Sequence, residues 1–298
     1  MWPTTRTGPV AEAVAAALWL VDKPAGPTSH DVVASVRRRL GRKVKVGHTG
    51  TLDPFATGLL VVMVGRATRL APLLTGLDKT YLATLRTGFT SGSGDPEGPI
   101  ARAGDPAAAG AIAAALPAFV GVQQQRVPAL SAVKVGGERL YARTRRGEET
   151  ELPEREIAVR ELRLVEDLGD GEAVLEVRCS AGTYVRRLAS DIGERLGCGA
   201  YLTALRRTAV GGMSVDDAVP PDGVGREGGI APLAALPHLP RRELDADGAL
   251  EVAHGRWRGD AGGSTEPVAL VREGRLVAVA RPDDGGVLRA GLVLEDPR

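Results

Sequence analysis

One stretch of the sequence, GHTGTLDPFATG at residues 47–58, restricts the fold more than any other because it joins an unusual loop to a buried strand. Glycine, threonine and proline make up most of it, and a single carboxylate, Asp53, lies in its middle. The next six residues, Leu59–Val64, are all apolar, which is typical of a buried strand. The sequence therefore predicts a long polar loop that leads directly into the protein core.

The order of the predicted elements favours an α+β fold. Apolar runs predict strands at Leu18–Val21, Lys79–Thr87 and 173–179, the last with clean alternation of apolar and polar residues. Apolar spacing predicts one helix with Ser29 as its N-cap and another that begins near Tyr184. Strands and helices do not alternate regularly along the chain, so a doubly wound parallel sheet is not expected.

Changes in composition suggest how the chain is divided. Residues 219–240 contain nine proline and glycine residues, which is typical of a linker. Beyond them, apolar runs at 268–271, 276–280 and 288–294 predict a small β-rich unit. With 298 residues, the chain is long enough for a large domain and a small one. We therefore predict domains at 1–237, with a long loop at 88–110, and at 238–298.

Positive charge is concentrated in the first third of the sequence. The formal net charge is only +1, but residues 1–90 hold twelve lysines and arginines against five acids. Six of these cations lie at residues 37–45, in RRRLGRKVK. Such a cluster fits a phosphate-facing surface, and it fits a solvated helix face equally well.

Several kinds of protein are disfavoured by the composition. The two cysteines, Cys179 and Cys198, show no C-x-x-C spacing, which argues against a zinc site and a disulfide framework. The apolar segment Ala13–Val21 is shorter than the roughly 20 residues that cross a bilayer, and no small-residue cleavage site follows it. We therefore expect a cytoplasmic protein with no metal site and no membrane partner.

Asp53 is the first candidate for chemistry. A carboxylate in a loop of glycine and threonine, between basic residues and a buried strand, can serve as a nucleophile or a base. Taken in isolation, Leu-Asp-Pro is more typical of a turn in which the carboxylate binds its own backbone. The local residues leave both interpretations open.

Four further blocks of sequence accompany the 47–58 stretch in a fixed order. They are VDKPAGPTS at 21–29, KTY at 79–81, SAVK at 131–134 with Gly137 and Tyr141–Arg143, and CSAGTYVR at 179–186 with 191–193 and 205–207. Together the five blocks resemble the tRNA pseudouridine synthase B (TruB) family over residues 18–213. Leu130 and Ala181 depart from the family, which often has tyrosine and lysine at these positions.

The resemblance implies a fold and a reaction. The fold would be a pseudouridine synthase fold, α+β with a central mixed, largely antiparallel sheet flanked by helices, plus a small β-rich PUA-like RNA-binding domain. The reaction would isomerise the uridine at position 55 in the T-loop of tRNA. The N-glycosidic bond opens, and the base rotates and rejoins the sugar through C5. Because the product is an isomer, the resemblance implies no cofactor.

The family also implies how the protein works with its substrate. We expect a stand-alone bacterial-type enzyme, a monomer, that binds the T-arm stem-loop of tRNA without a guide RNA. The target uridine is stacked inside the folded loop, so the enzyme has to flip it out.

Three residues would carry the catalysis if the resemblance holds. Asp53 would open the glycosidic bond, Arg186 would hold the Asp53 anion, and Tyr81 would stack on the target base. The sequence leaves open whether Asp53 attacks the sugar, attacks the uracil ring or deprotonates the sugar. Taken singly, Arg186 also fits a surface helix and Tyr81 also fits the core.

Other matching positions would bind the RNA. His48 would stack where the base leaves the loop, although a histidine bonded to nearby backbone is the plainer interpretation. Lysine side chains would meet phosphates and give salt-dependent binding. The expected substrate-binding residues are His48, Lys23, Lys79, Lys134, Tyr184, Leu205, Gly47 and Thr49.

Two other functions are weighed against this one. A non-catalytic RNA-binding protein or tRNA chaperone on the same scaffold predicts loss of the aspartate or the arginine, and the sequence has both Asp53 and Arg186. A glycosidase usually employs two paired carboxylates, and no second acid accompanies Asp53 in its motif.

Overall fold

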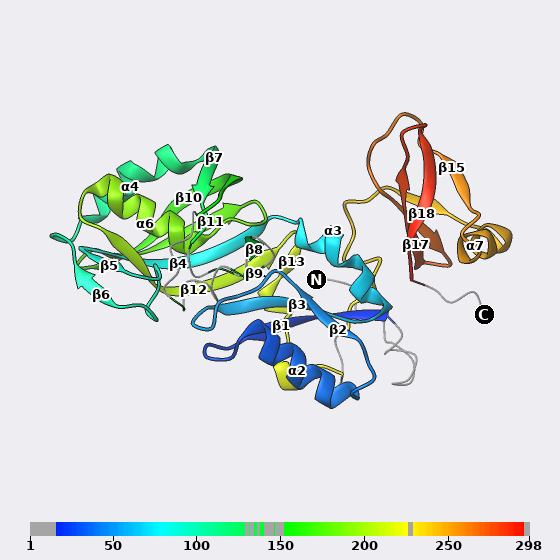
Figure 1. Cartoon of the computed structure of the whole chain (residues 1–298), viewed down its shortest axis with the longest axis horizontal. Coiled ribbons are helices and arrows are strands. Elements are labelled where there is room, and N and C mark those ends of the chain that lie inside the picture. Colours follow the sequence, from blue (N-terminus) through cyan, green and yellow to red (C-terminus); the bar gives the residue numbers. More distant parts are fainter. Residues whose placement is uncertain are drawn as a thin grey trace.

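The computed structural model describes residues 16–128, 152–225 and 229–294, together with 131, 134–135, 138–139 and 146. Two sheets dominate this part of the chain, and Figure 1 shows them as separate bodies joined by the segment between β13 and β14. The larger sheet has nine strands. Its main path runs in the order β1 (Ala16–Lys23), β3 (Thr57–Gly65), β12 (Ala200–Val210), β4 (Lys79–Thr87), β11 (Glu172–Cys179), β10 (Glu154–Gly169) and β7 (Gly121–Arg126).

Within this sheet the described strands pair antiparallel except at the centre, where β3 and β12 run parallel. Two short strands extend the sheet, with β2 (Val46–Thr49) on β3 and β13 (Met213–Ser214) on β12. The α+β class and the mixed, largely antiparallel sheet are therefore confirmed. The buried strand after the polar loop is confirmed too, since every side chain of Leu59–Val64 is at most 1% exposed.

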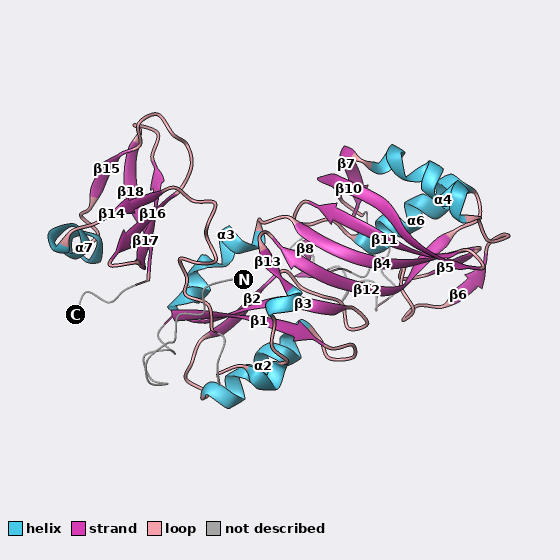
Figure 2. Ribbon diagram, turned by 180° about the vertical axis from the view of Figure 1, so that it is seen from behind, coloured by secondary structure: helices cyan, strands magenta, loops and turns pink. Residues whose placement is uncertain are grey.

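Helices cover the sheet at both ends, as Figure 2 shows. The helix α2 (Ser29–Leu40) packs its valines on β1, β2 and β3. At the other end, α4 (Ala109–Ala115) and α6 (Val185–Leu196) pack on β4, β10, β11 and β12. The short helix α3 (Ala71–Thr75) follows the 3-10 turn η1 (Arg66–Leu70). Further 3-10 turns are η2 (Leu116–Phe119), η3 (Val215–Asp217) and η4 (Pro221–Gly223).

The start of α2 corrects a detail of the sequence prediction. Thr28, and not Ser29, is the N-cap, and it forms a capping box with Asp31. Ser29 does not cap the helix. Its side chain is buried, and its hydroxyl binds the loop that carries Asp53.

The region predicted as a long loop, 88–110, contains more structure than its composition suggests. A short hairpin forms from β5 (Phe89–Ser91) and β6 (Ile100–Arg102), and α4 already begins at Ala109. The hairpin tip folds back, so that the carbonyl of Gly94 accepts a hydrogen bond from the amide of Leu202. A second hairpin, β8 (Lys134–Val135) with β9 (Glu138–Arg139), lies in the SAVK block.

The C-terminal part confirms the small β-rich unit. Its five strands follow the order β14 (Arg241–Glu243), β16 (Val268–Arg272), β17 (Arg275–Pro282), β18 (Val287–Val293) and β15 (Arg258–Asp260), and α7 (Ala246–Ala253) packs beside them. Side chains of η1 reach the end of this unit, with Arg66 bonded to the carbonyl of Leu294 and Arg69 to that of Val293. The domain boundary at 237/238 stays a prediction.

Among the described residues, no helix combines the length and the apolar character that crossing a bilayer requires.

The packing of α6 on β12 gives a stability prediction. A Cβ at Gly193 would lie 2.0 Å from the amide nitrogen of Ala200, whereas a Cβ at the helical Gly110 would meet nothing within 4 Å. We expect Gly193→Ala to lower the free energy of unfolding by at least about 2 kcal/mol, because the helix has to move off the sheet. Gly110→Ala should be neutral or stabilise by up to about 1 kcal/mol.

Urea denaturation of the two variants and the wild type measures both values. Equal effects of the two substitutions would contradict the close packing of α6.

Candidate active site

The residues singled out by the sequence surround one cavity of about 650 Å³ in the middle of the large sheet. It lies where the 47–58 loop, β4, β12 and the start of α6 meet the tip of the β5–β6 hairpin. Six of the predicted site residues line it: Asp53, Lys79, Tyr81, Tyr184, Arg186 and Leu205. These six residues come from three of the five sequence blocks, so segments far apart in the chain converge on one cavity.

The loop that carries Asp53 is fixed from below by α2 and the turn before it. The hydroxyl of Ser29 donates to the carbonyl of Leu52 (3.0 Å) and accepts from the amide of Leu52 (2.8 Å). On the other side of Asp53, the carbonyl of Pro54 accepts bonds from the amide of Gly26 (2.9 Å) and the ammonium of Lys23 (3.2 Å). The aspartate is therefore held at both flanking residues.

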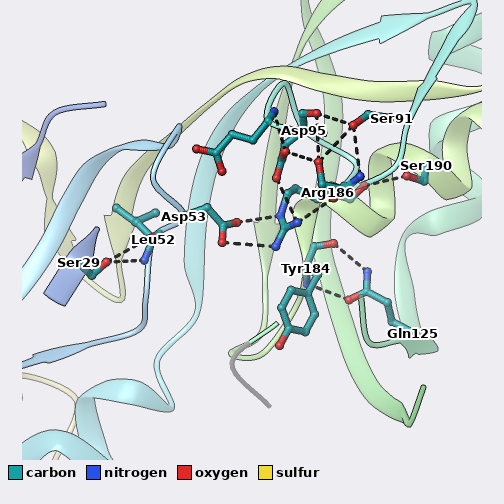
Figure 3. Close-up of polar contacts among 11 residues, drawn as sticks. Ser29, Leu52, Asp53, Ser91, Asp95, Gln125, Tyr184, Arg186 and Ser190 are labelled. Carbon is teal, nitrogen blue, oxygen red and sulfur yellow. Dashed lines mark hydrogen bonds and ion pairs between the residues drawn. The ribbon is translucent and has the colours of Figure 1, made fainter. Parts of the chain in front are cut away.

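Arg186 meets the carboxylate of Asp53 side by side, as Figure 3 shows. Its Nε lies 2.8 Å from Oδ2, and its Nη2 lies 3.4 Å from Oδ1. The Arg186 side chain is 5% exposed, while that of Asp53 is 36% exposed and open to the cavity. This two-point contact fixes the orientation of the carboxylate and leaves one side of it accessible.

A second carboxylate, Asp95, holds the same arginine from behind. Its Oδ2 lies 3.1 Å from Nη1 of Arg186, and the side chain is 4% exposed. Asp95 is fixed in turn by the hydroxyl of Ser93 and by the amide of Glu97 (3.0 Å). The main chain of Ser93 also accepts from Arg186 (2.8 Å). The hairpin tip therefore acts as a bracket for the guanidinium.

These contacts set the charge state of the site. Burial raises the pKa of Asp53 above its ordinary value, Arg186 opposes the rise, and repulsion from Asp95 adds to it. Desolvation at the cavity wall, followed by repulsion from Asp95 and Asp53, likewise raises the pKa of Glu97. The site thus combines a carboxylate that burial makes less acidic than usual with an arginine that favours its ionised form.

The cavity walls are apolar and aromatic. Tyr81 on β4 is 8% exposed, and Leu205 on β12 is 6% exposed. Tyr184 lies just before α6, where the side-chain amide of Gln125 binds both its amide (2.8 Å) and its carbonyl (3.0 Å). Flat rings and a leucine side chain beside a charged pair suit a planar ligand that carries polar edges.

Two of the lysines predicted to bind phosphates bind backbone carbonyls of the protein instead. Lys23 is fully buried, and its ammonium donates to the carbonyls of Pro24 (2.9 Å), Pro27 (2.7 Å) and Pro54 (3.2 Å). Lys79 is 5% exposed and donates to the carbonyls of Thr75 and Leu77, both at 2.5 Å. We therefore correct their expected role: both ammonium groups hold backbone in place.

Burial also affects the charge of these two lysines. Burial, followed by the charge of the nearby Arg207, lowers the pKa of Lys79 to about 8. Burial likewise lowers the pKa of Lys23, although Asp53 opposes this.

The remaining predicted residues lie around the cavity and do not line it. His48 and Thr49 are on β2, with Thr49 fully buried and His48 half-buried. Burial, followed by the charges of Arg207 and His30, lowers the pKa of His48, so its ring is neutral at physiological pH. A Cβ at Gly47 would touch the Met63 and Thr68 side chains. The side chain of Lys134, Gly137 and residues 141–143 lie outside the described residues.

Three residues of the site escaped the sequence reasoning as functional residues. Asp95 and Glu97 lie in the region predicted as a loop, and Arg207 was noted only as part of a matching block. The spacing S-x-S-x-D-x-E at 91–97 is a signal for the two acids, since serines and acids at alternate positions favour a self-bonded turn. No local signal shows that this turn faces Arg186.

Acidic and metal-binding side chains form no cluster of three or more that could hold a metal ion, within the part of the chain that the structure describes.

Comparison with known proteins identifies the family. Residues 37–185 match the TruB family pseudouridylate synthase N-terminal domain, and residues 186–224 match the tRNA pseudouridylate synthase B C-terminal domain. A tRNA pseudouridine synthase B from a Synechococcus species is 44% identical, over 93% of this chain and 96% of that protein. The chain belongs to the TruB family. The resemblance inferred from the five blocks is confirmed, and with it the class of enzyme, a pseudouridine synthase.

Other relatives support the same assignment. The tRNA pseudouridine synthase B of Thermobifida fusca is 45% identical over 89% of this chain and 94% of its own length. Among solved structures, a chain in the crystal structure of a Cbf5–Nop10–Gar1 complex superposes with a TM-score of 0.75 at 26% identity, covering 99% of this TruB-family chain and 90% of that chain.

Membership of the TruB family argues against a glycosidase, whereas the number of acids near Asp53 does not. The structure places Asp95 and Glu97 in the same cavity as Asp53, so the argument from a missing second acid does not hold. The buried Asp95 is nevertheless ion-paired to Arg186, unlike the free acid that a glycosidase needs to protonate its leaving group.

The triad of Asp53, Arg186 and Asp95 predicts opposite effects of two substitutions on one pKa. Asp95→Asn removes a repelling charge, so it should lower the pKa of Asp53. Arg186→Gln removes an attracting charge, so it should raise the same pKa. Carbon-13 NMR titration of the aspartate carboxyl groups measures the shifts.

Asp191→Asn is the matched control, because Asp191 pairs with Arg187 on the same helix and does not face Asp53. A shift of the Asp53 pKa in the same direction in both test variants would contradict the arrangement.

Proposed function

We propose that this chain isomerises uridine to pseudouridine at position 55 in the T-loop of tRNA. The two relatives described above are named tRNA pseudouridine synthase B, which supports tRNA as the substrate. The observation that carries the proposal is the ion pair of Asp53 and Arg186, which opens into a cavity walled by Tyr81. A volume of about 650 Å³ is sufficient for a nucleoside that has left its stack.

The geometry suits the isomerisation because the reaction needs a held base and one reactive carboxylate. In this proposal Asp53 opens the bond between C1′ and N1 of the flipped uridine. The uracil turns within the apolar walls and rejoins C1′ through C5, while the proton on C5 leaves and N1 gains one. Atoms and charge therefore balance without a co-reactant. Arg186 favours the ionised form of Asp53 and fixes its carboxylate at the cavity wall.

Tyr81 and Leu205 retain the uracil while it turns. Both lie on neighbouring strands of the sheet, and both side chains are almost fully buried. A rigid sheet behind the base limits it to rotation in place, which favours rejoining over escape. The half-buried, neutral His48 is proposed to replace part of the stacking that the base loses when it is flipped out.

The backbone of the RNA is proposed to meet the basic cluster at 37–45. The helix α2 starts at the cavity, which Thr28 lines, and its 12 residues extend about 18 Å to this cluster. Arg38, Arg42 and Lys43 are exposed there. We assign catalysis to residues 1–237 and further RNA contact to a PUA-like domain at 238–298. The enzyme would act as a cytoplasmic monomer without a guide RNA.

A direct test uses an unmodified T-arm stem-loop RNA. We expect the wild type to convert the uridine that corresponds to position 55, as mapped by carbodiimide treatment and primer extension. Asp53→Asn should lower kcat by about 10⁴-fold or more, because it removes the reactive group. Arg186→Lys keeps the charge but loses the two-point contact, so kcat should fall by about 10²–10³-fold.

Binding of the same RNA, measured by filter retention, separates the alternatives. Full affinity with no conversion by the wild type would favour a non-catalytic tRNA chaperone. Normal turnover by Asp53→Asn would refute the assigned chemistry.

We expect the exposed cluster and the buried lysines to contribute differently to the salt dependence of RNA binding. Replacing Arg38, Arg42 and Lys43 by glutamine should reduce the slope of log K against log salt by about 2–3, since each exposed cation releases roughly one counterion. Lys79→Met should leave this slope unchanged, because its ammonium already binds two carbonyls. Titrations of each variant with RNA at several salt concentrations measure these slopes. A smaller slope in Lys79→Met would show that this lysine does bind a phosphate.

A further inference from the structure

Arg207 is the largest fully buried side chain of the described residues, with 1% exposure, and it lies at the floor of the cavity. Among those residues it forms no ion pair, and its guanidinium donates to two backbone carbonyls. Its Nε donates to the carbonyl of Leu59 (2.7 Å), and its Nη2 donates to the carbonyl of Gly50 (3.0 Å). A buried cation without an opposing carboxylate is costly, so its presence calls for an explanation.

Both ends of the 47–58 loop touch this one residue. Gly50 has φ +67°, and a Cβ there would lie 3.4 Å from Nη1 of Arg207. At the far end, Gly58 has φ +98°, and a Cβ would lie 2.3 Å from the carbonyl oxygen of Arg207. The side chain thus holds one end of the loop, and the main chain of the same residue holds the other. Asp53 lies between these two points.

Arg207 is also the direct neighbour of Tyr81 across the sheet. The register of β12 on β4 places Arg207 opposite Tyr81, so their side chains lie on the same face. Burial raises the pKa of the Tyr81 hydroxyl, and the charge of Arg207 opposes the rise. Because a guanidinium can only donate, the hydroxyl oxygen is the acceptor in any hydrogen bond between these two neighbours. The proton of that hydroxyl is then free to point at an acceptor in the cavity.

We propose that Arg207 is a positioning residue that fixes the Asp53 loop and directs the Tyr81 hydroxyl proton toward the bound base. Uracil offers two ring carbonyl oxygens as acceptors, and they gain charge when the bond to N1 opens. A directed hydroxyl stabilises that charge without reorganisation. This inference rests on the proposed function for its chemistry, whereas the anchoring of the loop does not.

The test compares Arg207→Lys with Tyr81→Phe, the double variant and a control, Arg206→Lys. Arg206 is the sequence neighbour on β12, and it pairs with Asp22 at the surface (3.0 and 2.8 Å). We expect Arg207→Lys to keep the KM for the T-arm stem-loop and to lower kcat by about 10–100-fold, because a lysine cannot hold all three partners. Arg206→Lys should match the wild type.

The double variant distinguishes positioning from a general structural role. If Arg207 acts through the Tyr81 hydroxyl, the double variant should lose little more than the worse of the two single variants. Additive losses would overturn the proposal, as would a wild-type kcat in Arg207→Lys. Tyr81→Phe removes one oxygen only, so a wild-type kcat in that variant overturns the proposal even if Arg207→Lys fails to fold.

Hydrogen exchange measured by mass spectrometry tests the anchor without RNA. Arg207→Lys should exchange faster in residues 47–58 than the wild type, with α4 unchanged as an internal reference. If the wild type leaves the T-loop uridine unconverted, the proposed function fails while this measurement still judges the anchor. Unchanged exchange in residues 47–58 would refute the anchoring role.

Discussion

The site depends on one buried guanidinium. Arg186 is enclosed by two carboxylates and a backbone carbonyl, and this enclosure lets a charged aspartate exist at the wall of a largely apolar cavity. Asp53 alone would be driven toward its neutral form by burial. Asp95 supports the arginine and at the same time limits how far it can acidify Asp53. The balance leaves a carboxylate that is less acidic than an exposed one.

Backbone carbonyls act as the partners of the other buried cations. Lys23, Lys79 and Arg207 donate to carbonyls at turns and strand ends, and none of them is more than 5% exposed. Each therefore fixes a segment that borders the cavity: the turn before α2, the end of α3 and the 47–58 loop. Lys23 and Lys79 resemble RNA contacts in the sequence, but in the structure they hold the backbone around the cavity, whereas the cluster at 37–45 contains exposed cations.

Much of the fold could be predicted from the sequence because short stretches of residues specify many of its strands and helices. Leu59–Val64 is uniformly apolar and 173–179 alternates, so their strands and burial follow directly. The hairpin at 89–102 was predicted as a loop because its glycine, serine and proline content is typical of loops. Its tip is ordered by contacts with α6 and β12, which are about 90 to 110 residues away in the chain.

By itself the sequence determined the family and the α+β class, because motif spacing and residue type record them directly. It also predicted Asp53, Tyr81 and Arg186 as site residues, and these three line one cavity. Only the tertiary structure decided which charges face each other. Whether a lysine meets solvent or a carbonyl, and whether Asp95 supports Arg186, depends on segments brought together by the sheet. The energy of a charge is set by what surrounds it in space, and neighbours in space are not neighbours in sequence.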